Sequence, residues 1–433
     1  MEAILAAFHA FAERLSPHEP FPAADFRRVL EPVFAAAGYR TPRAAGERSE
    51  LLVIMDAGVG DFICLSGALR EIRRLYPQAA ITLVIFPPAF KLAEQCPYID
   101  FLLGNEQLPV LRPLSELFTQ HARYAAEHLL KQRFDIAFVF GHYASSHLLA
   151  YMAGAKERIG HVKDFAEGGL SREACAALLT RGFTPPAGAL HLADRCLDML
   201  DQLLAAPVAN RSPELWLSRE DIAGVREKLA QLGAPLAGRK LFAVCLGGSA
   251  KRKHWPPASY SAFLRLLLQE EPQAFFLLLG GRDDRAEAAD VERALGEAYA
   301  LSLAGALDFR ETATAITLCA AYIGNDTSLL HIAAVVGLPV LEICCYAADL
   351  PLDEKAIPMS YYPYRTAAVV VQPARALADC REEPRDAYGC KHTGEAHCIA
   401  SIAPATVLEA YHLLLQQAAA GKRQPLFVCE EEA

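Results

Sequence analysis

The stretch from residue 51 to residue 77, LLVIMDAGVGDFICLSGALREIRRLYP, constrains the fold more than any other part of this chain. It begins with an apolar run typical of a buried strand, Leu51 to Met55, and continues through a Gly-x-Gly turn at Gly58 and Gly60. Apolar residues then recur at helical spacing until Pro77 ends the pattern. A strand, a glycine loop and a helix in this order form the repeating unit of parallel α/β sheets. Ligands gather at such loops, because the helix presents its free N–H groups there.

The alternation of strands and helices occurs twice along the 433 residues, which are too many for one ordinary domain. The pattern predicts an α/β protein with two doubly wound, Rossmann-like domains, each a mainly parallel sheet with helices on both faces. The expected parts are a helical N-terminal extension at 1–48, a first domain at 49–212, a second domain at 213–402, and a C-terminal helix and tail at 403–433.

Composition excludes several classes of protein. A formal net charge of −9 argues against a nucleic-acid partner, and no apolar run is long enough to predict a membrane-spanning helix. The N-terminal stretch is predicted to be an amphipathic helix rather than a signal peptide. The twelve cysteines are scattered, mostly within apolar segments, as reduced and buried thiols are. We therefore expect a cytoplasmic protein.

The glycine loop of the first unit ends in a carboxylate, Asp61. A dinucleotide-binding loop would have a third glycine where Ile63 stands, and an acidic residue after the second strand, which instead ends in Phe86-Pro87. A carboxylate at this place would also repel a pyrophosphate. Asp is favoured in the first turn of any helix, so position alone favours a helix cap over a catalytic group.

Two loops of the second half have the residue types of a phosphate site. Residues 247–256, GGSAKRKHWP, follow a buried strand with glycines and three cations, which suit close approach to a diphosphate. Their place after the strand favours a binding loop over an ordinary solvated one. Residues 324–331, GNDTSLLH, run from a strand into a helix whose first turn offers N–H groups and hydroxyls. Taken alone, this second stretch is better explained by ordinary helix capping, with His331 a satisfied histidine on the first turn.

A group of cysteines near the C-terminus contains metal-ligand types. Cys380, Cys390 and Cys398 lie close in sequence, with His392 and His397 among them, and such residues bind zinc or iron. No C-x-x-C pair occurs, and the spacings match no metal motif. The sequence therefore favours reduced loop cysteines over a structural metal at Cys380, Cys390 and Cys398.

Taken together and in order, these stretches resemble glycosyltransferase family nine, the ADP-heptose lipopolysaccharide heptosyltransferases. The resemblance rests on the stretch 51–77 and on FDIAFVFGHYASSHLLAYMAGAKERIG, FAVCLGGSAKRKHWPPASY and YIGNDTSLLHIAAVVGLPVL, which together span most of residues 51–345. It implies a GT-B fold, in which two Rossmann-like domains face each other across a cleft and the C-terminal helix packs back on the first. It also implies an acceptor bound by the first half and a nucleotide sugar bound by the second.

The resemblance further implies which residues act. Family transferases invert the anomeric centre without a catalytic metal, and their base is the carboxylate after the glycine loop, here Asp61, with Gly58 and Gly60 on the acceptor side. This outweighs the interpretation of Asp61 as a cap. The implied donor-binding residues are Ser249, Lys251, Lys253, Asp326, Thr327, Ser328, Leu329 and His331. The chain departs from the family in having Ser328 for the usual glycine and Met55-Asp56 where a basic residue is common.

We therefore expect an inverting, metal-independent transfer of heptose from ADP-heptose to a hydroxyl of a lipopolysaccharide-type saccharide or of a protein, with no cofactor. Two alternatives stay open: a nucleotide-sugar epimerase of the same architecture, and a non-catalytic relative that binds nucleotide. The sequence leaves the oligomeric state undetermined. Basic residues before the first strand, Arg40, Arg43 and Arg48, suggest peripheral contact with the cytoplasmic face of the inner membrane.

Overall fold

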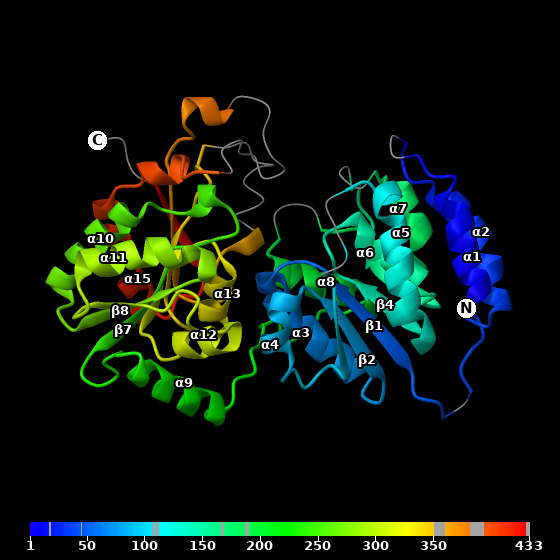
Figure 1. The fold of residues 1–433 in the computed structure, drawn as a ribbon, viewed down its shortest axis with the longest axis horizontal. Helices are drawn as coiled ribbons and strands as arrows, with labels where there is room; N and C mark the ends of the chain where they lie inside the picture. The colour runs from blue at the N-terminus through cyan, green and yellow to red at the C-terminus, as the bar shows by residue number, and fades with distance from the viewer. Residues whose placement is uncertain are drawn as a thin grey trace. The chain divides into compact units, whose positions relative to one another are not determined.

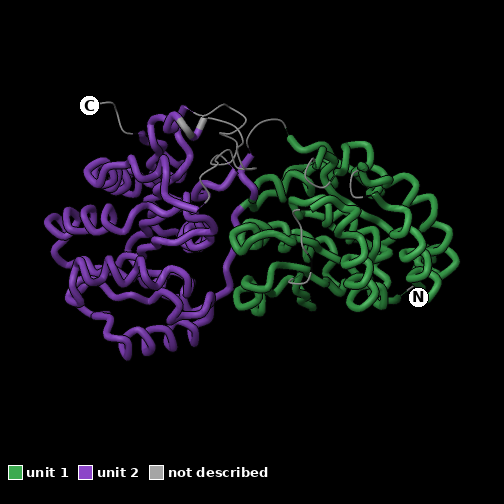
Figure 2. Tube along the Cα trace, turned by 45° about the horizontal axis from the view of Figure 1, so that its top comes forward, with its two compact units in different colours: residues 1–187, 193–211 green, residues 188–192, 212–433 purple. Residues whose placement is uncertain are grey.

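The computed structural model describes residues 1–16, 19–44, 46–105, 108, 112–165, 169–186, 190–349, 360–381 and 394–429. The chain divides into two compact units (Figure 2). Unit 1 contains residues 1–187 and 193–211, and unit 2 contains residues 188–192 and 212–433. No helix among the described residues is both long enough and apolar enough to cross a membrane.

The sheet of unit 1 is parallel throughout, with the strand order β3-β2-β1-β4-β5-β6 (Figure 1). Its first strand is apolar and almost wholly buried, as the sequence predicts. The order reverses between β1 and β4, which is the switch point of a doubly wound sheet. The strands are β1 (Glu50–Met55), β2 (Ala80–Ile85), β3 (Phe101–Gly104), β4 (Ile136–Val139), β5 (Glu157–His161) and β6 (Arg181–Phe183).

The helices of unit 1 connect these strands or precede them. They are α1 (Glu2–Ala12), α2 (Ala23–Ala36), α3 (Val59–Leu75), α4 (Phe90–Ala93), α5 (Leu114–Tyr124), α6 (Ala144–Met152), α7 (Arg172–Leu178) and α8 (Leu192–Leu204). A single turn of π-helix, Ala125–Leu129, and a 3-10 turn, Leu130–Gln132, continue α5. Helix α3 starts within the Gly-x-Gly turn, with Gly58 as its N-cap and its first-turn N–H groups at the carboxyl end of β1.

The N-terminal helices α1 and α2 are part of the core of unit 1, which corrects the expected separate extension at 1–48. Figure 1 shows them against α5 and α7. Phe26 of α2 lies at the centre, with ring centroids 4.9 Å from Phe11, 5.2 Å from Phe118 and 5.0 Å from Tyr151. An isolated amphipathic helix pair buries little apolar surface, and these aromatic rings are buried only because α5 and α6 cover them.

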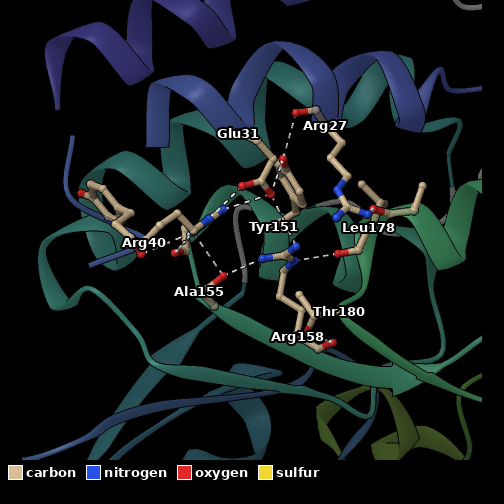
Figure 3. A network of polar contacts seen from close by, with 11 residues as sticks. Arg27, Glu31, Arg40, Tyr151, Ala155, Arg158, Leu178 and Thr180 are labelled. Carbon is tan, nitrogen blue, oxygen red and sulfur yellow. Dashed lines mark hydrogen bonds and ion pairs between the residues drawn. The ribbon is translucent and has the colours of Figure 1, made fainter. Parts of the chain in front are cut away.

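A polar network joins α2 to the body of unit 1 (Figure 3). The carboxylate of Glu31 accepts hydrogen bonds from Arg40 Nε at 2.8 Å and from the Tyr151 hydroxyl at 3.0 Å. Arg158, with 1% of its side chain exposed, donates to the carbonyls of Leu178 and Ala155 at 2.7 and 2.6 Å. Its guanidinium stacks over the Tyr151 ring at 4.7 Å. Burial lowers the pKa of Arg158 to about 10, so it keeps its charge at neutral pH.

We expect Arg158→Ala to destabilise unit 1 by about 3 kcal/mol or more, because the change leaves buried acceptors without a donor. The measurement is urea denaturation followed by circular dichroism. Arg28→Ala is the control, since Arg28 is 72% exposed and pairs with Asp25 on the same helix surface. It should change stability by less than about 0.5 kcal/mol. Equal midpoints for the two variants would contradict a structural role for Arg158.

The basic residues expected to contact a membrane surface each form an ion pair within unit 1. Arg40 pairs with Glu31 at 2.8 Å, Arg43 with Asp135 at 2.6 Å, and Arg48 with Asp100 at 2.8 Å. Each cation has a carboxylate partner, so its field toward solvent is largely cancelled. These three arginines therefore give no support to peripheral membrane contact.

The sheet of unit 2 is also parallel, with the order β13-β12-β11-β10-β7-β8-β9, and reverses between β7 and β10. The strands are β7 (Lys240–Cys245), β8 (Ala274–Leu279), β9 (Ala300–Ser302), β10 (Ala321–Asn325), β11 (Val340–Ile343), β12 (Ala368–Gln372) and β13 (Pro425–Cys429). The helices are α9 (Arg219–Gln231), α10 (Pro257–Glu270), α11 (Arg285–Leu295), α12 (Phe309–Ile316), α13 (Ser328–Val335) and α15 (Pro404–Ala419). The prediction of two doubly wound, parallel α/β units is confirmed.

The C-terminal segment differs from what the sequence suggested. Helix α15 was expected to pack on the first domain, but it packs against β12, β11 and α10 of its own unit. Its apolar residues Val407, Tyr411 and Leu414 are buried in the core of unit 2. The chain then forms β13, which pairs with β12, instead of a polar tail alone. The run Pro425–Cys429 is apolar, and the edge of β12 supplies hydrogen-bond partners that a free tail lacks.

Candidate active site

Each unit has a candidate site at its switch point, where the segments that follow two adjacent strands lie side by side and lead to opposite halves of the sheet. In unit 1 the first turn of α3, which follows β1, contains Asp61, and His142 lies in the loop after β4. In unit 2 the loop after β7 contains Lys253, and Asp326 follows β10. The strand order therefore brings together side chains that are far apart in sequence. Two adjacent parallel strands end at the same edge of the sheet.

Asp61 lies in the first turn of α3 and contacts His142. The Nε2 of His142 is 2.9 Å from Oδ1 of Asp61, and since a carboxylate only accepts, the imidazole donates. Both side chains are largely but not wholly buried. Gly58 leaves room for the acid, because a Cβ there would lie 2.9 Å from Asp61 Oδ2. Gly60 lies in the first turn of α3, directly before Asp61. The carboxylate is thus oriented by an imidazole, which a simple helix cap does not require.

A second carboxyl group, Asp56, lies beneath this loop at the end of β1. It is 3% exposed, accepts a hydrogen bond from Ser146 Oγ at 2.6 Å, and its other oxygen has no partner among the described residues. Gly141 makes this contact possible, since a Cβ there would come within 2.2 Å of Asp56 Oδ1. Burial, with a smaller contribution from the charge of Asp61, raises the pKa of Asp56 to about 6.

The raised pKa of Asp56 predicts a pH dependence of stability with a definite sign. The folded pKa of about 6 lies above the ordinary value of 3.8, so the stabilisation is present at low pH and is lost as pH rises through 6. The loss amounts to up to about 3 kcal/mol. Asp56→Asn cannot ionise, so its stability relative to the wild type should be higher at pH 8 than at pH 4.5, measured by urea denaturation.

Asp100→Asn is the matched control for this pH experiment. Burial opposes ionisation of Asp100, but hydrogen bonds from the Ile81 N–H, Arg73 and Arg48 prevail and lower its pKa. Its stabilisation is therefore fully present above the ordinary pKa of 3.8, so the relative stability of Asp100→Asn should be nearly the same at pH 4.5 and pH 8. If Asp100→Asn gained as much relative stability as Asp56→Asn between these two pH values, the assignment for Asp56 would be wrong.

In unit 2, Lys253 and Asp326 form a partly buried ion pair. Lys253 Nζ is 2.6 Å from Asp326 Oδ2, and the two side chains are 15% and 13% exposed. Burial alone would lower the pKa of Lys253, but the charge of Asp326 prevails and raises it above its usual value. Glu342 of β11 is buried nearby, and burial together with Asp326 raises its pKa well above the ordinary range.

Lys251, expected to bind the donor, is held by a different carboxylate. Its Nζ is 2.5 Å from Glu287 Oε1 on α11, and the other oxygen of Glu287 is 2.8 Å from Nδ1 of His254. Burial raises the pKa of Glu287, but Lys251 and His254 outweigh it and lower that pKa. Lys251 and Lys253 both belong to the short 3-10 turn η5 (Lys251–Lys253), but their ammonium groups pair with carboxylates on different elements. Ser249 is exposed in the loop before this turn.

The other expected donor-binding residues lie at the start of α13. Thr327 is the N-cap, and its hydroxyl accepts from the Leu329 N–H at 3.1 Å. Ser328 is the first helical residue and is partly exposed. The side chains of Leu329 and His331 are buried, so Leu329 contributes backbone and not side chain to this surface. The structure thus brings Asp326 and Thr327 to one loop and places His331 inside the unit.

Sequence reasoning missed several residues that shape these sites. His142 lies three residues after the end of β4, and the signal for it in the sequence was a polar residue after a glycine at a strand end. Asn325 is fully buried at the end of β10, accepts from the Tyr260 hydroxyl at 2.9 Å and donates to the Leu246 carbonyl. It therefore ties the loop after β7 to the loop after β10. Nothing in the sequence pointed to Glu287, because it lies on helix α11 and not in a loop that follows a strand.

Comparison with known proteins gives a consistent result. The family model of glycosyltransferase family 9 (heptosyltransferase) matches residues 123–385, which is more than half of the chain. A lipooligosaccharide heptosyltransferase 2 of Haemophilus ducreyi is 24% identical over 313 residues, covering 70% of this chain and 84% of that protein.

Solved structures support the same fold. A glycosyltransferase family 9 protein of Veillonella parvula superimposes with a TM-score of 0.67 at 18% identity, covering 86% of this chain and 100% of that one. The Escherichia coli ADP-heptose lps heptosyltransferase II gives a TM-score of 0.61 at 20% identity, with coverages of 85% and 99%. The fold of the chain is thus that of the GT-B heptosyltransferases.

Proposed function

The chain belongs to glycosyltransferase family 9, the heptosyltransferases, and from this premise we propose that it transfers heptose from ADP-heptose to a hydroxyl of a lipopolysaccharide-type saccharide. The observation that carries the proposal is the pair of switch-point sites, a carboxylate oriented by His142 in unit 1 and an ammonium paired with Asp326 in unit 2. The donor and acceptor follow the names of similar proteins, among them a heptosyltransferase that uses ADP-heptose. The thiol-rich composition supports a cytoplasmic location.

In the proposed reaction Asp61 removes the proton from the acceptor hydroxyl. The hydroxyl oxygen attacks the anomeric carbon, the bond from that carbon to the diphosphate oxygen breaks, and ADP leaves with the bonding electrons. One displacement inverts the anomeric centre. The hydrogen bond from His142 Nε2 to Asp61 Oδ1, at 2.9 Å, fixes the orientation of the carboxylate. A base positioned in this way contributes about 10²–10⁴-fold to the rate.

Unit 2 is proposed to bind the donor diphosphate. Lys253 has three N–H donors, so its ammonium can bond a phosphate oxygen while it keeps Asp326. The N–H groups at the start of α13 add partial positive charge. These groups stabilise the charge that develops on ADP, and the proposed chemistry needs no metal.

The test combines binding and turnover. Calorimetry against ADP, GDP and UDP should show a preference for ADP. ADP-heptose with a lipopolysaccharide core saccharide should then give a heptosylated product, detected by mass spectrometry, and the rate should be the same in the presence of a chelator.

Other outcomes would contradict the proposal. Preference for UDP or GDP would overturn the heptose assignment, and isomerisation of the donor in the absence of an acceptor would identify an epimerase. Absence of nucleotide binding would favour a non-catalytic relative, and transfer to a protein hydroxyl alone would replace the proposed acceptor.

A further inference from the structure

Two cysteines and a histidine near the C-terminus come together in unit 2. One ligand atom each from Cys380, His397 and Cys398 lies within 4.8 Å of the other two. Cys380 belongs to the 3-10 turn η7 (Ala378–Arg381) after β12, and Cys398 opens η8 (Cys398–Ser401) before α15. The sequence favoured reduced loop cysteines here, and Cys390 and His392 lie outside the described residues.

The surroundings of these side chains suit a bound cation. Cys380 and Cys398 are 4% and 6% exposed, and the cysteines described by the structure form no disulfide. Both thiols pack in one apolar cluster with Val370 of β12 and with Tyr346, which follows β11.

The distances and bonds agree with metal ligation. Cys398 Sγ is 3.3 Å from His397 Nδ1, and the Leu377 N–H donates to the same sulfur at 3.5 Å. Tetrahedral zinc, with bonds of about 2.3 Å to sulfur and about 2.0 Å to nitrogen, separates two such ligand atoms by about 3.5 Å. A backbone N–H directed at the sulfur is the outer hydrogen bond that supports a thiolate ligand.

Charge favours zinc over a hard cation. Zn²⁺ with two thiolates and a neutral imidazole has no net charge, so its burial costs little, whereas Mg²⁺ and Ca²⁺ require oxygen ligands. His254, Asp284 and Glu287 form another group of metal-ligating side chains, but this group already pairs with a cation. The ammonium of Lys251 already lies 2.5 Å from its Glu287 carboxylate, where a second cation would be repelled.

We propose that Cys380, His397 and Cys398 bind a structural zinc ion that joins η7 to η8. Binding releases the two thiol protons, one from each cysteine, and forms two Zn–S bonds and one Zn–N bond. The site belongs to neither switch point, so the proposal is independent of the sugar transfer.

The test is the metal content of the full chain, purified under reducing conditions without chelator. Mass spectrometry of the metals should find about one zinc per chain, falling at least tenfold in Cys380→Ser and Cys398→Ser. Cys429→Ser is the matched control, since Cys429 is exposed on β13, and it should keep its zinc. Metal-free protein titrated with Co²⁺ should develop a thiolate-to-cobalt charge-transfer band, which Cys398→Ser lacks.

The wild type alone also decides the matter if the serine variants do not fold. A thiol-specific mercurial should release the zinc stoichiometrically into a colorimetric chelator. Three results would each overturn the proposal: protein without zinc that binds Co²⁺ no better than Cys380→Ser, a Cys380–Cys398 disulfide in reduced preparations, or zinc retained in full by both serine variants.

Discussion

Asp61→Asn should lower kcat by about 10²–10⁴-fold and leave the affinity for ADP unchanged. The amide has the shape of the carboxylate, and its oxygen still accepts the hydrogen bond from His142 Nε2, so the loop after β1 should keep its conformation. What is lost is the basic oxygen that takes the acceptor proton. The residues proposed for the donor belong to unit 2, so ADP binding should not respond. The measurement is ADP release with acceptor present, together with calorimetry of ADP binding.

Asp25→Asn makes the same chemical change at an exposed site on α2, where the carboxylate pairs with Arg28. It should turn over at the wild-type rate, which controls for the loss of one negative charge. Turnover of Asp61→Asn within about twofold of the wild type would reject Asp61 as the base. A fall in both turnover and the unfolding midpoint would instead point to the cap interpretation, because first-turn carboxylates stabilise helices.

Lys253→Ala should weaken ADP binding by about 10- to 150-fold, the equivalent of about 1.5–3 kcal/mol for hydrogen bonds to a charged group. The change also removes the partner of Asp326, 2.6 Å away and 13% exposed, so a carboxylate is left in the place proposed for the diphosphate. Like charges repel, so the measured loss should lie at the upper end of this range. The experiment is calorimetric titration with ADP at two salt concentrations.

Lys240→Ala is the matched control in the same unit, because Lys240 also forms an ion pair, with Glu271, but lies at the opposite end of β7. Its ADP affinity should equal that of the wild type. The double variant Lys253→Ala with Asp326→Asn should regain part of the affinity, since the unpaired charge is gone. Unchanged ADP affinity in Lys253→Ala would exclude this lysine from the donor site.

Several elements were predictable because their signals are local. The run Leu51 to Met55 and the glycine turn after it specify a buried strand and a helix start through spacing and backbone freedom alone. The strand at 241–246 and its basic loop were found in the same way. Short strands such as β6 (Arg181–Phe183) and β13 (Pro425–Cys429) were missed, because an alternating or apolar pattern is hard to recognise over only three to five residues.

The sequence by itself determined two doubly wound α/β units, the loops that bear the candidate residues, and a family resemblance that the family match confirms. Only the tertiary structure decided which side chains meet. His142 lies 81 residues from Asp61, and Asp326 lies 73 residues from Lys253. These pairs exist because β4 lies next to β1, and β10 next to β7, in the two sheets. Strand order arises from packing over the whole unit, and no local pattern records it.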